Sequence, residues 1–236
     1  MYTLPSLTAR IGATLGASLV AIGCTQAATE TPAIPELNRS VAVRLTCPAV
    51  DDLTYFVPRE LLLPEELGVM DARRRTPKAR APVFPEFLQL AKLDSLSCGV
   101  DVPETYRFIY YRSYQPVFVI AVRRESAAWS VRTFETNDPH QRLPLAIASS
   151  NTRTPSRPEF ERFAQSLRGR DFWDIPTRGE PFAEGADWAQ WVFEGRKGLR
   201  YHLVVRYPRI PAEIGITQLG EAFASVAALE WPPKDR

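Results

Sequence analysis

Three runs rich in β-branched and aromatic residues lie close together in the middle of the chain, at residues 106–112, 117–123 and 128–135. Only short connections separate them, and such connections favour an antiparallel meander over parallel strands. Residues 117–122 are apolar at every position, so both faces of this strand are predicted to be buried. We therefore expect the middle run to be an inner strand of the sheet.

The clearest helix signal begins at Ser156, because Ser156 and Glu159 have the spacing of a capping box. One apolar stripe follows at i, i+3, i+4 and i+7, formed by Phe160, Phe163, Ala164 and Leu167. Gly169 is the expected stop of this helix. Further helices are predicted at 58–70, 84–93 and 216–229, and a first strand at 41–47.

A hairpin is predicted over residues 188–206, with its turn at 195–198. An even-length turn pairs even positions of the first strand with odd positions of the second. The more apolar face then carries Trp188, Gln190, Val192, Glu194, Tyr201, Leu203, Val205 and Tyr207, and it is expected to meet the core. The opposite face is the candidate binding face, formed by Trp191, Phe193, His202 and Arg206. Trp191 is expected beside His202 and near Arg206, so that aromatic and cationic side chains alternate across the pair.

These elements predict an α+β fold, an antiparallel meander sheet with helices packed on one face. About 200 residues follow the N-terminal region, which is enough for one domain with a sizeable core. We place this single domain at residues 37–236.

The N-terminal region predicts export. Arg10 precedes an apolar and small-residue run at 11–23, which is too short for a membrane-spanning helix and typical of a secretory signal. Residues 20–24 resemble the lipobox of bacterial lipoprotein signals, and this resemblance implies a lipid anchor at Cys24 after removal of 1–23. A cut after Ala27 is the alternative. Residues 24–36 are expected to be a flexible tether to the membrane, and the body to face the periplasm, at the outer membrane in a Gram-negative cell.

Charge and cysteine content narrow the classes of function. The chain has 29 Lys and Arg against 27 Asp and Glu, a balance that does not favour a nucleic-acid partner. Beyond Cys24, two cysteines remain, Cys47 and Cys98. In an exported protein, such a pair is predicted to form a disulfide, with two buried thiols as the alternative.

A set of C-terminal residues resembles a module of uncharacterised exported bacterial proteins. Its pattern is FWxxP, DxxxW, ExxxG, YH and RxP, matched here by Phe172, Trp173, Pro176, Asp187, Trp191, Glu194, Gly195, Gly198, Tyr201, His202, Arg206 and Pro208. The resemblance implies a compact α+β domain of bacterial origin and no particular activity. Trp188 stands where many members have glycine.

Catalytic and metal-binding patterns are scarce. The two histidines, His140 and His202, have no partner at metal-ligand spacing, and no nucleophile elbow or phosphate loop is present, so we predict no cofactor and no metal. Glu194 and His202 could form an acid–base couple, although packing of His202 on Trp191 is the simpler interpretation. Arg73, Arg74 and Arg75 form a candidate basic contact loop for lipid phosphates or an acidic partner.

Three functions follow, in order of preference. The first is a non-catalytic envelope lipoprotein that binds another protein, such as an inhibitor or immunity protein. The second is an envelope assembly or scaffold component that uses the basic loop. The third is an enzyme of unrecognised type that uses Glu194 and His202.

Overall fold

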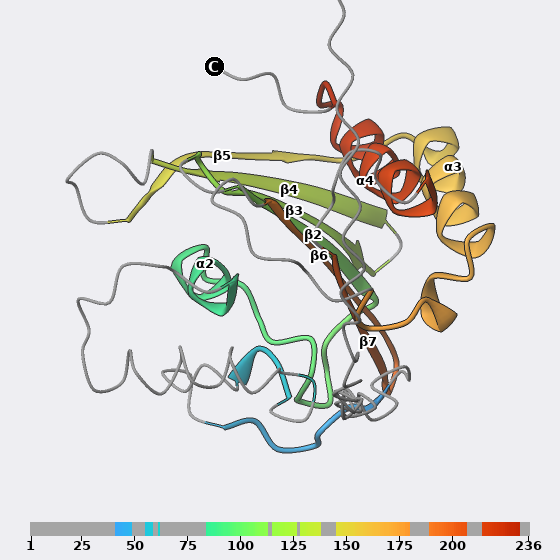
Figure 1. Ribbon diagram of the computed structural model, residues 1–236. Helices are drawn as coiled ribbons and strands as arrows, with labels where there is room; N and C mark the ends of the chain where they lie inside the picture. The colour runs from blue at the N-terminus through green and yellow to red at the C-terminus, as the bar shows by residue number, and fades with distance from the viewer. Residues whose placement is uncertain are drawn as a thin grey trace, which may run out of the picture. The chain divides into compact units, whose positions relative to one another are not determined.

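The structure is a computed structural model, and it describes residues 41–48, 55–58, 61, 84–112, 115–126, 128–137, 145–179, 189–206 and 214–231. Within these residues, seven strands form one antiparallel sheet in the order β1-β7-β6-β2-β3-β4-β5 (Figure 1). The strands are β1 Val41–Ala42, β2 Thr105–Arg112, β3 Phe118–Glu125, β4 Ala128–Thr136, β5 Ile147–Arg153, β6 Ala189–Lys197 and β7 Arg200–Arg206.

Consecutive strands β2 to β5 form the meander, and the β6–β7 hairpin pairs with the free side of β2. The apolar strand β3 is an inner strand, as expected, while β2 occupies the middle of the sheet. The hairpin turns at Gly198 and Leu199, because Lys197 pairs with Arg200. This turn lies later than predicted, but its even length preserves the predicted grouping of side chains into two faces.

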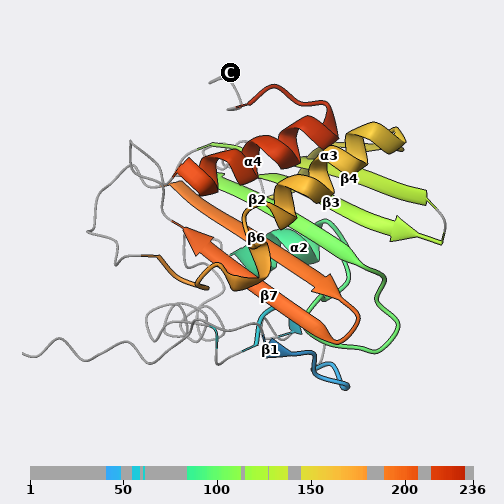
Figure 2. The ribbon, with the colours of Figure 1, turned by 90° about the vertical axis from the view of Figure 1, so that its right-hand side faces the viewer.

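Both faces of the sheet are covered. Helices α3 (Arg157–Arg168) and α4 (Ile214–Ala227) lie across one face, together with the short helix η3 (Phe172–Asp174) (Figure 2). Helix α2 (Phe84–Leu90) packs on the opposite face. The predicted α+β class with an antiparallel meander is confirmed. Helices lie on both faces rather than on one, because α2 packs on the face opposite α3 and α4.

Helix α3 has the predicted start and packing. The backbone N–H of Ser156 donates to Oε2 of Glu159 at 2.6 Å, and Phe163 and Leu167 are buried. Phe160 stacks on Trp129 with ring centroids 3.9 Å apart. Gly169 follows the last helical residue, but its φ of −65° is right-handed, and the left-handed residue is Asp171 at φ 46°. The chain therefore reverses two residues later than the glycine suggested.

Several predictions fall outside the described residues: the signal at 1–23, Cys24, the tether at 24–36, most of the helix at 58–70, and the loop with Arg73, Arg74 and Arg75. All described residues belong to one compact unit, Pro35–Arg236. None of the helices in this described part combines the length and hydropathy needed to cross a membrane.

Candidate functional site

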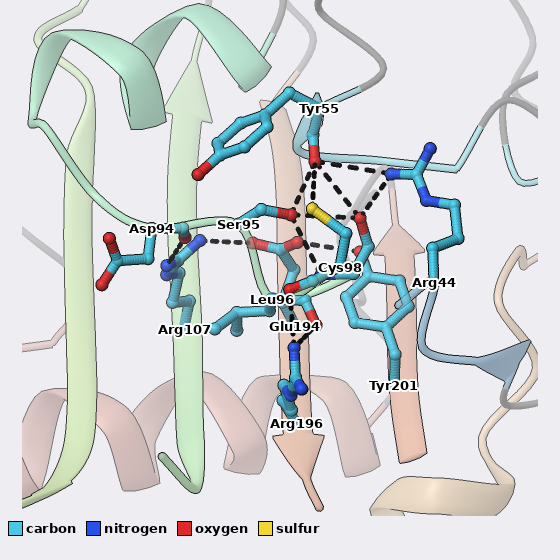
Figure 3. A network of polar contacts seen from close by, with 11 residues as sticks. Arg44, Tyr55, Asp94, Ser95, Leu96, Cys98, Arg107, Glu194, Arg196 and Tyr201 are labelled. Atoms are coloured by element: carbon cyan, nitrogen blue, oxygen red, sulfur yellow. Dashed lines mark hydrogen bonds and ion pairs between the residues drawn. The ribbon is translucent and has the colours of Figure 1, made fainter. Parts of the chain in front are cut away.

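A buried ionic centre lies on the α2 side of the sheet, formed by Arg107, Glu194 and Tyr201 (Figure 3). Arg107 of β2 and Glu194 of β6 are directly paired across the sheet, which brings Nη1 and Oε2 to 3.6 Å. The hydroxyl of Tyr201 on β7 donates to Oε1 of Glu194 at 2.8 Å. The exposed fractions of the Arg107 and Glu194 side chains are 2% and 0%.

Burial dominates the electrostatics of this centre. It raises the pKa of Glu194, and the nearby Arg107 guanidinium and the Tyr201 hydroxyl oppose that rise. Burial also raises the pKa of Tyr201, and the adjacent Glu194 carboxylate adds to that rise. An arginine stays protonated in proteins, so the centre consists of a guanidinium, a carboxylate and a neutral phenol held together in a low dielectric.

Arginine side chains on the same side of the sheet donate hydrogen bonds to the carbonyl groups of residues 94–99 and so hold this segment in place. Arg196 donates to the carbonyls of Cys98 and Gly99 at 2.7 and 2.6 Å, and Nη2 of Arg107 donates to the carbonyl of Asp94. Arg44 bonds Oγ of Ser97 at 2.9 Å. The Cys47–Cys98 disulfide joins this segment to the chain after β1, with Cα atoms 5.2 Å apart, so the predicted pairing is confirmed.

The geometry of the ionic centre favours a structural role over a catalytic one. The carboxylate of Glu194 is fully covered and lies between Arg107 and Tyr201, although its Oε2 and the Arg107 Nη1 are 3.6 Å apart and make no hydrogen bond. The proposed couple of Glu194 with His202 is also wrong in this structure. Glu194 pairs with Leu203 and His202 with Gly195, so the two side chains point to opposite faces of the same hairpin.

The candidate binding face is an internal layer rather than a surface. Trp191, Phe193, His202 and Arg206 have exposed fractions of 7%, 0%, 1% and 6%. Phe193 lies under Phe223 of α4, and Trp231 covers Trp191, with ring centroids 5.9 and 5.4 Å apart respectively. Trp191 pairs with Arg206 and lies far along the hairpin from His202, contrary to the expected neighbourhood. The sequence pattern grouped these residues correctly but did not reveal which segments cover them.

Comparison with known proteins adds no relative. No family model matches this sequence, and neither the curated proteins nor the solved structures give a significant match.

The residues of the C-terminal pattern pack the segment 172–178 onto the hairpin. A Cβ atom on Gly195 would lie 2.4 Å from the Phe172 ring, so only glycine leaves room for that ring. Phe172 in turn stands edge-on to His202 at 5.3 Å. Nη1 of Arg206 donates to the carbonyl of Thr177 at 3.3 Å. Where they are described, these residues act as a packing unit. Asp187 and Pro208 lie outside the described residues.

This packing makes the stability of the protein sensitive to acid through His202. Burial lowers the pKa of His202 from 6.5 to about 4, and a hydrogen bond with the backbone of Ile175 opposes this shift. The unfolded chain therefore binds a proton at His202 below pH 6.5, whereas the folded chain does not until about pH 4. We expect denaturant titrations to show a loss of about 3 kcal/mol in the free energy of unfolding between pH 7 and pH 4.

A His202→Gln variant serves as the control, because it cannot take up that proton. Its free energy of unfolding is expected to change much less over the same range. A hydrogen bond from Arg153 is the main cause that lowers the pKa of Glu159 to about 2. Both proteins contain Glu159, and its contribution to the free energy of unfolding is lost only below pH 4.5. Equal slopes for both proteins between pH 6.5 and 4.5 would contradict the assignment to His202.

Strand β5 is the surface element that the sequence analysis missed. It is the outermost strand next to β4, and residues 148–152 are all exposed. Its sequence, Ile-Ala-Ser-Ser-Asn-Thr-Arg, carries no apolar alternation. Backbone pairing with β4 holds it in the sheet, together with the side chains at its two ends, Ile147 against the core and Arg153 on Glu159. The flanking residues Pro144 and Pro155 were the only local signal of an element between them.

Among the described residues, no group of three or more His, Cys, Asp or Glu side chains could hold a metal ion. The open edge of β5 is thus the feature with the clearest capacity to engage another molecule.

Proposed function

We propose that this protein is a non-catalytic, exported protein-binding module of the bacterial cell envelope, and that β5 is its docking edge. The observation that carries the proposal is the exposure of β5 at one end of a seven-stranded sheet. An edge strand presents unpaired N–H and C=O groups, and an extended segment of a partner can pair with them as an added strand.

The two ends of the sheet differ in this respect. At the other end, β7 is covered twice along its length: Val41 and Ala42 of β1 pair with Tyr201 and Arg200, and Arg178 forms a bridge to Val205. The backbone N–H of Val205 donates to the carbonyl of Thr177 at 2.7 Å. Among the described strands, β5 is therefore the long edge with backbone groups left for a partner.

The side chains of β5 indicate what kind of segment fits. Residues 148–152 are small or polar and uncharged, so they neither repel a partner of either charge nor require a matching charge. Arg153 is turned inward, where Nη2 contacts Glu159 at 2.7 Å. We infer that the partner supplies an extended, largely uncharged segment, and that main-chain hydrogen bonds contribute most of the affinity.

The cellular location of this module is also part of the proposal. The disulfide between Cys47 and Cys98 supports folding in an oxidising compartment, where such bonds persist. A lipid anchor at Cys24 would hold the module at the membrane while β5 stays free to bind. An inhibitor or immunity protein with a partner in the same compartment fits these properties.

Proline substitutions on β5 test the docking edge. Neighbouring residues in a strand direct their N–H groups to opposite sides, so one of Ser149 and Ser150 faces β4 and the other faces the open edge. Proline at the residue whose N–H faces β4 removes a hydrogen bond of the sheet and lowers the melting temperature. Proline at the residue whose N–H faces the open edge removes only the outward donor. In pull-downs from envelope extract of the producing cells, we expect both variants to lose the partner at least tenfold.

The decisive variant is the one that keeps the melting temperature of the wild type. The matched control is Ser150→Thr, which preserves the backbone donor and is expected to retain capture. A photo-reactive residue at position 150 should cross-link to the captured protein, and one at the exposed Gln165 of α3 should not. Undiminished capture by the stable proline variant would reject β5 as the docking edge.

A further inference from the structure

We infer that β5 also pairs with β5 of a second copy, and that the resulting dimer protects the docking edge until a partner takes its place. This inference rests on the proposed function, since it concerns the same edge. An exposed edge strand can pair with other chains without control unless a structural feature or a bound partner covers it.

The usual protective features are scarce on β5. Residues 148–152 contain no lysine, no other charged residue and no proline, and the register irregularity lies at one end of the strand, where Thr136 pairs with Ile147. The rest of the β4–β5 ladder, from Val131 with Arg153 to Glu135 with Ser149, is regular. The strand is thus regularly paired and uncharged over the stretch that a second copy would contact.

The sequence of β5 suits antiparallel pairing with itself. A two-fold axis through Ser150, the middle residue of Ile147–Arg153, places Ser150 opposite Ser150 and Ala148 opposite Thr152 of the second copy. Both kinds of antiparallel residue pair, hydrogen-bonded and non-hydrogen-bonded, admit such an axis, so the register does not depend on which way the N–H of Ser150 points. No like charges face each other in this register.

The rest of the sheet limits the assembly to two copies. At the other end of the sheet, β1 and the segment around Arg178 pair with β7, so β7 offers no second long edge among the described strands. The contact is isologous and closes on itself, unlike a head-to-tail contact that would grow into a fibre. One strand per copy makes a small interface, so the dimer is expected to be reversible and concentration-dependent.

Cysteine cross-linking tests the register. We use the full chain with Cys24→Ser, in which Cys47 and Cys98 are already joined, and add Ser150→Cys, Ala148→Cys or Thr152→Cys. Side chains at these positions share one face of β5. Oxidation of the Ser150→Cys protein is expected to give a covalent dimer, because opposed Cα atoms lie about 4.5–5.5 Å apart and a disulfide spans that distance.

The Ala148→Cys and Thr152→Cys proteins supply the matched controls. Each alone places its two thiols about four residues apart along the strands, roughly 13 Å, and is expected to stay monomeric on oxidation. A mixture of the two is expected to cross-link as a heterodimer. Equal cross-linking of all three single variants would show random collision and overturn the inference, as would sedimentation of the wild type as a monomer at every concentration.

The protective role has its own readout. The cross-linked Ser150→Cys dimer is expected to capture at least tenfold less of the envelope partner than the Ser150→Thr protein, and undiminished capture would overturn this role. The cross-linking experiment needs no partner. Failure of the proposed function would therefore leave the dimer standing, and absence of the dimer would leave capture by the monomer intact.

Discussion

Replacement of Arg107 with methionine is expected to lower the free energy of unfolding by about 3–5 kcal/mol, although no functional surface is touched. The guanidinium lies 3.6 Å from Glu194, and both side chains are buried. Methionine fills much of the same volume but leaves the carboxylate of Glu194 without its counter-charge in a low dielectric. The substitution also removes the bond from Nη2 to the carbonyl of Asp94, so the segment 94–99 loses one of its attachments to the sheet.

Urea titration at pH 7 and at pH 5 measures this effect. Without Arg107, the pKa of Glu194 rises further, because burial already raises it and the opposing charge is gone. A group whose pKa is raised by folding stabilises the fold in its protonated form, so the deficit of the variant is expected to be smaller at pH 5 than at pH 7. A deficit that does not change with pH would contradict an uncompensated carboxylate as its cause.

A combined variant separates lost packing from lost charge. Arg107→Met, Glu194→Leu and Tyr201→Phe together remove the whole ionic centre and leave no buried group without its partner among the three. Replacement of a complete buried pair by apolar residues is often close to neutral, so most of the stability is expected to return. If the combined variant is as unstable as Arg107→Met alone, the centre acts through shape rather than charge.

The ionic centre shows where sequence reasoning reaches its limit. The even length of the turn fixes which side chains share a face, and this grouping correctly placed Glu194 with Val192, Leu203 and Val205, although the predicted pairing of individual residues was wrong. A carboxylate on a face predicted to meet the core implies a buried cation. Its identity depends on the pairing of β6 with β2, two strands separated by about 80 residues of chain, and no local pattern encodes that contact.

The error over the candidate binding face has a related cause. Alternation of aromatic and cationic side chains is typical of an exposed face when one side of a hairpin meets the core. Here α4 and Trp231 cover the second side as well. The Trp231 ring packs closely on Gly220, where an added Cβ atom would lie 3.1 Å from the ring. Arg206 remains buried by bonding carbonyl groups, including that of Val205 at 2.9 Å. Strand β5 was missed for a different reason: most of its residues are small or polar, so the sequence shows no alternation of apolar positions there.

Loss of the disulfide is the second large effect that we expect. Cys47→Ala with Cys98→Ala opens a closure between residues 51 positions apart, and the loop-entropy model assigns about 4 kcal/mol to a closure of this length. Alanine is preferred to serine because Cys98 is 1% exposed and a hydroxyl there would need a new hydrogen-bond partner. Guanidinium titration of the variant and of the wild type with and without reductant measures the effect, and reduced wild type should match the variant.

The folded state of this variant is expected to keep its geometry, which locates the effect in the unfolded chain. Arg196 still holds the carbonyls of Cys98 and Gly99, and the backbone N–H of Arg44 still donates to the carbonyl of Ser97 at 3.0 Å. Segment 96–99 therefore stays on the sheet without the covalent link. Near-native circular dichroism with a lower unfolding midpoint would support this account, and an unchanged midpoint on reduction would contradict it. A chain that relies on this bond for a large share of its stability reaches its full stability only where thiols are oxidised, which joins the fold to the exported location proposed above.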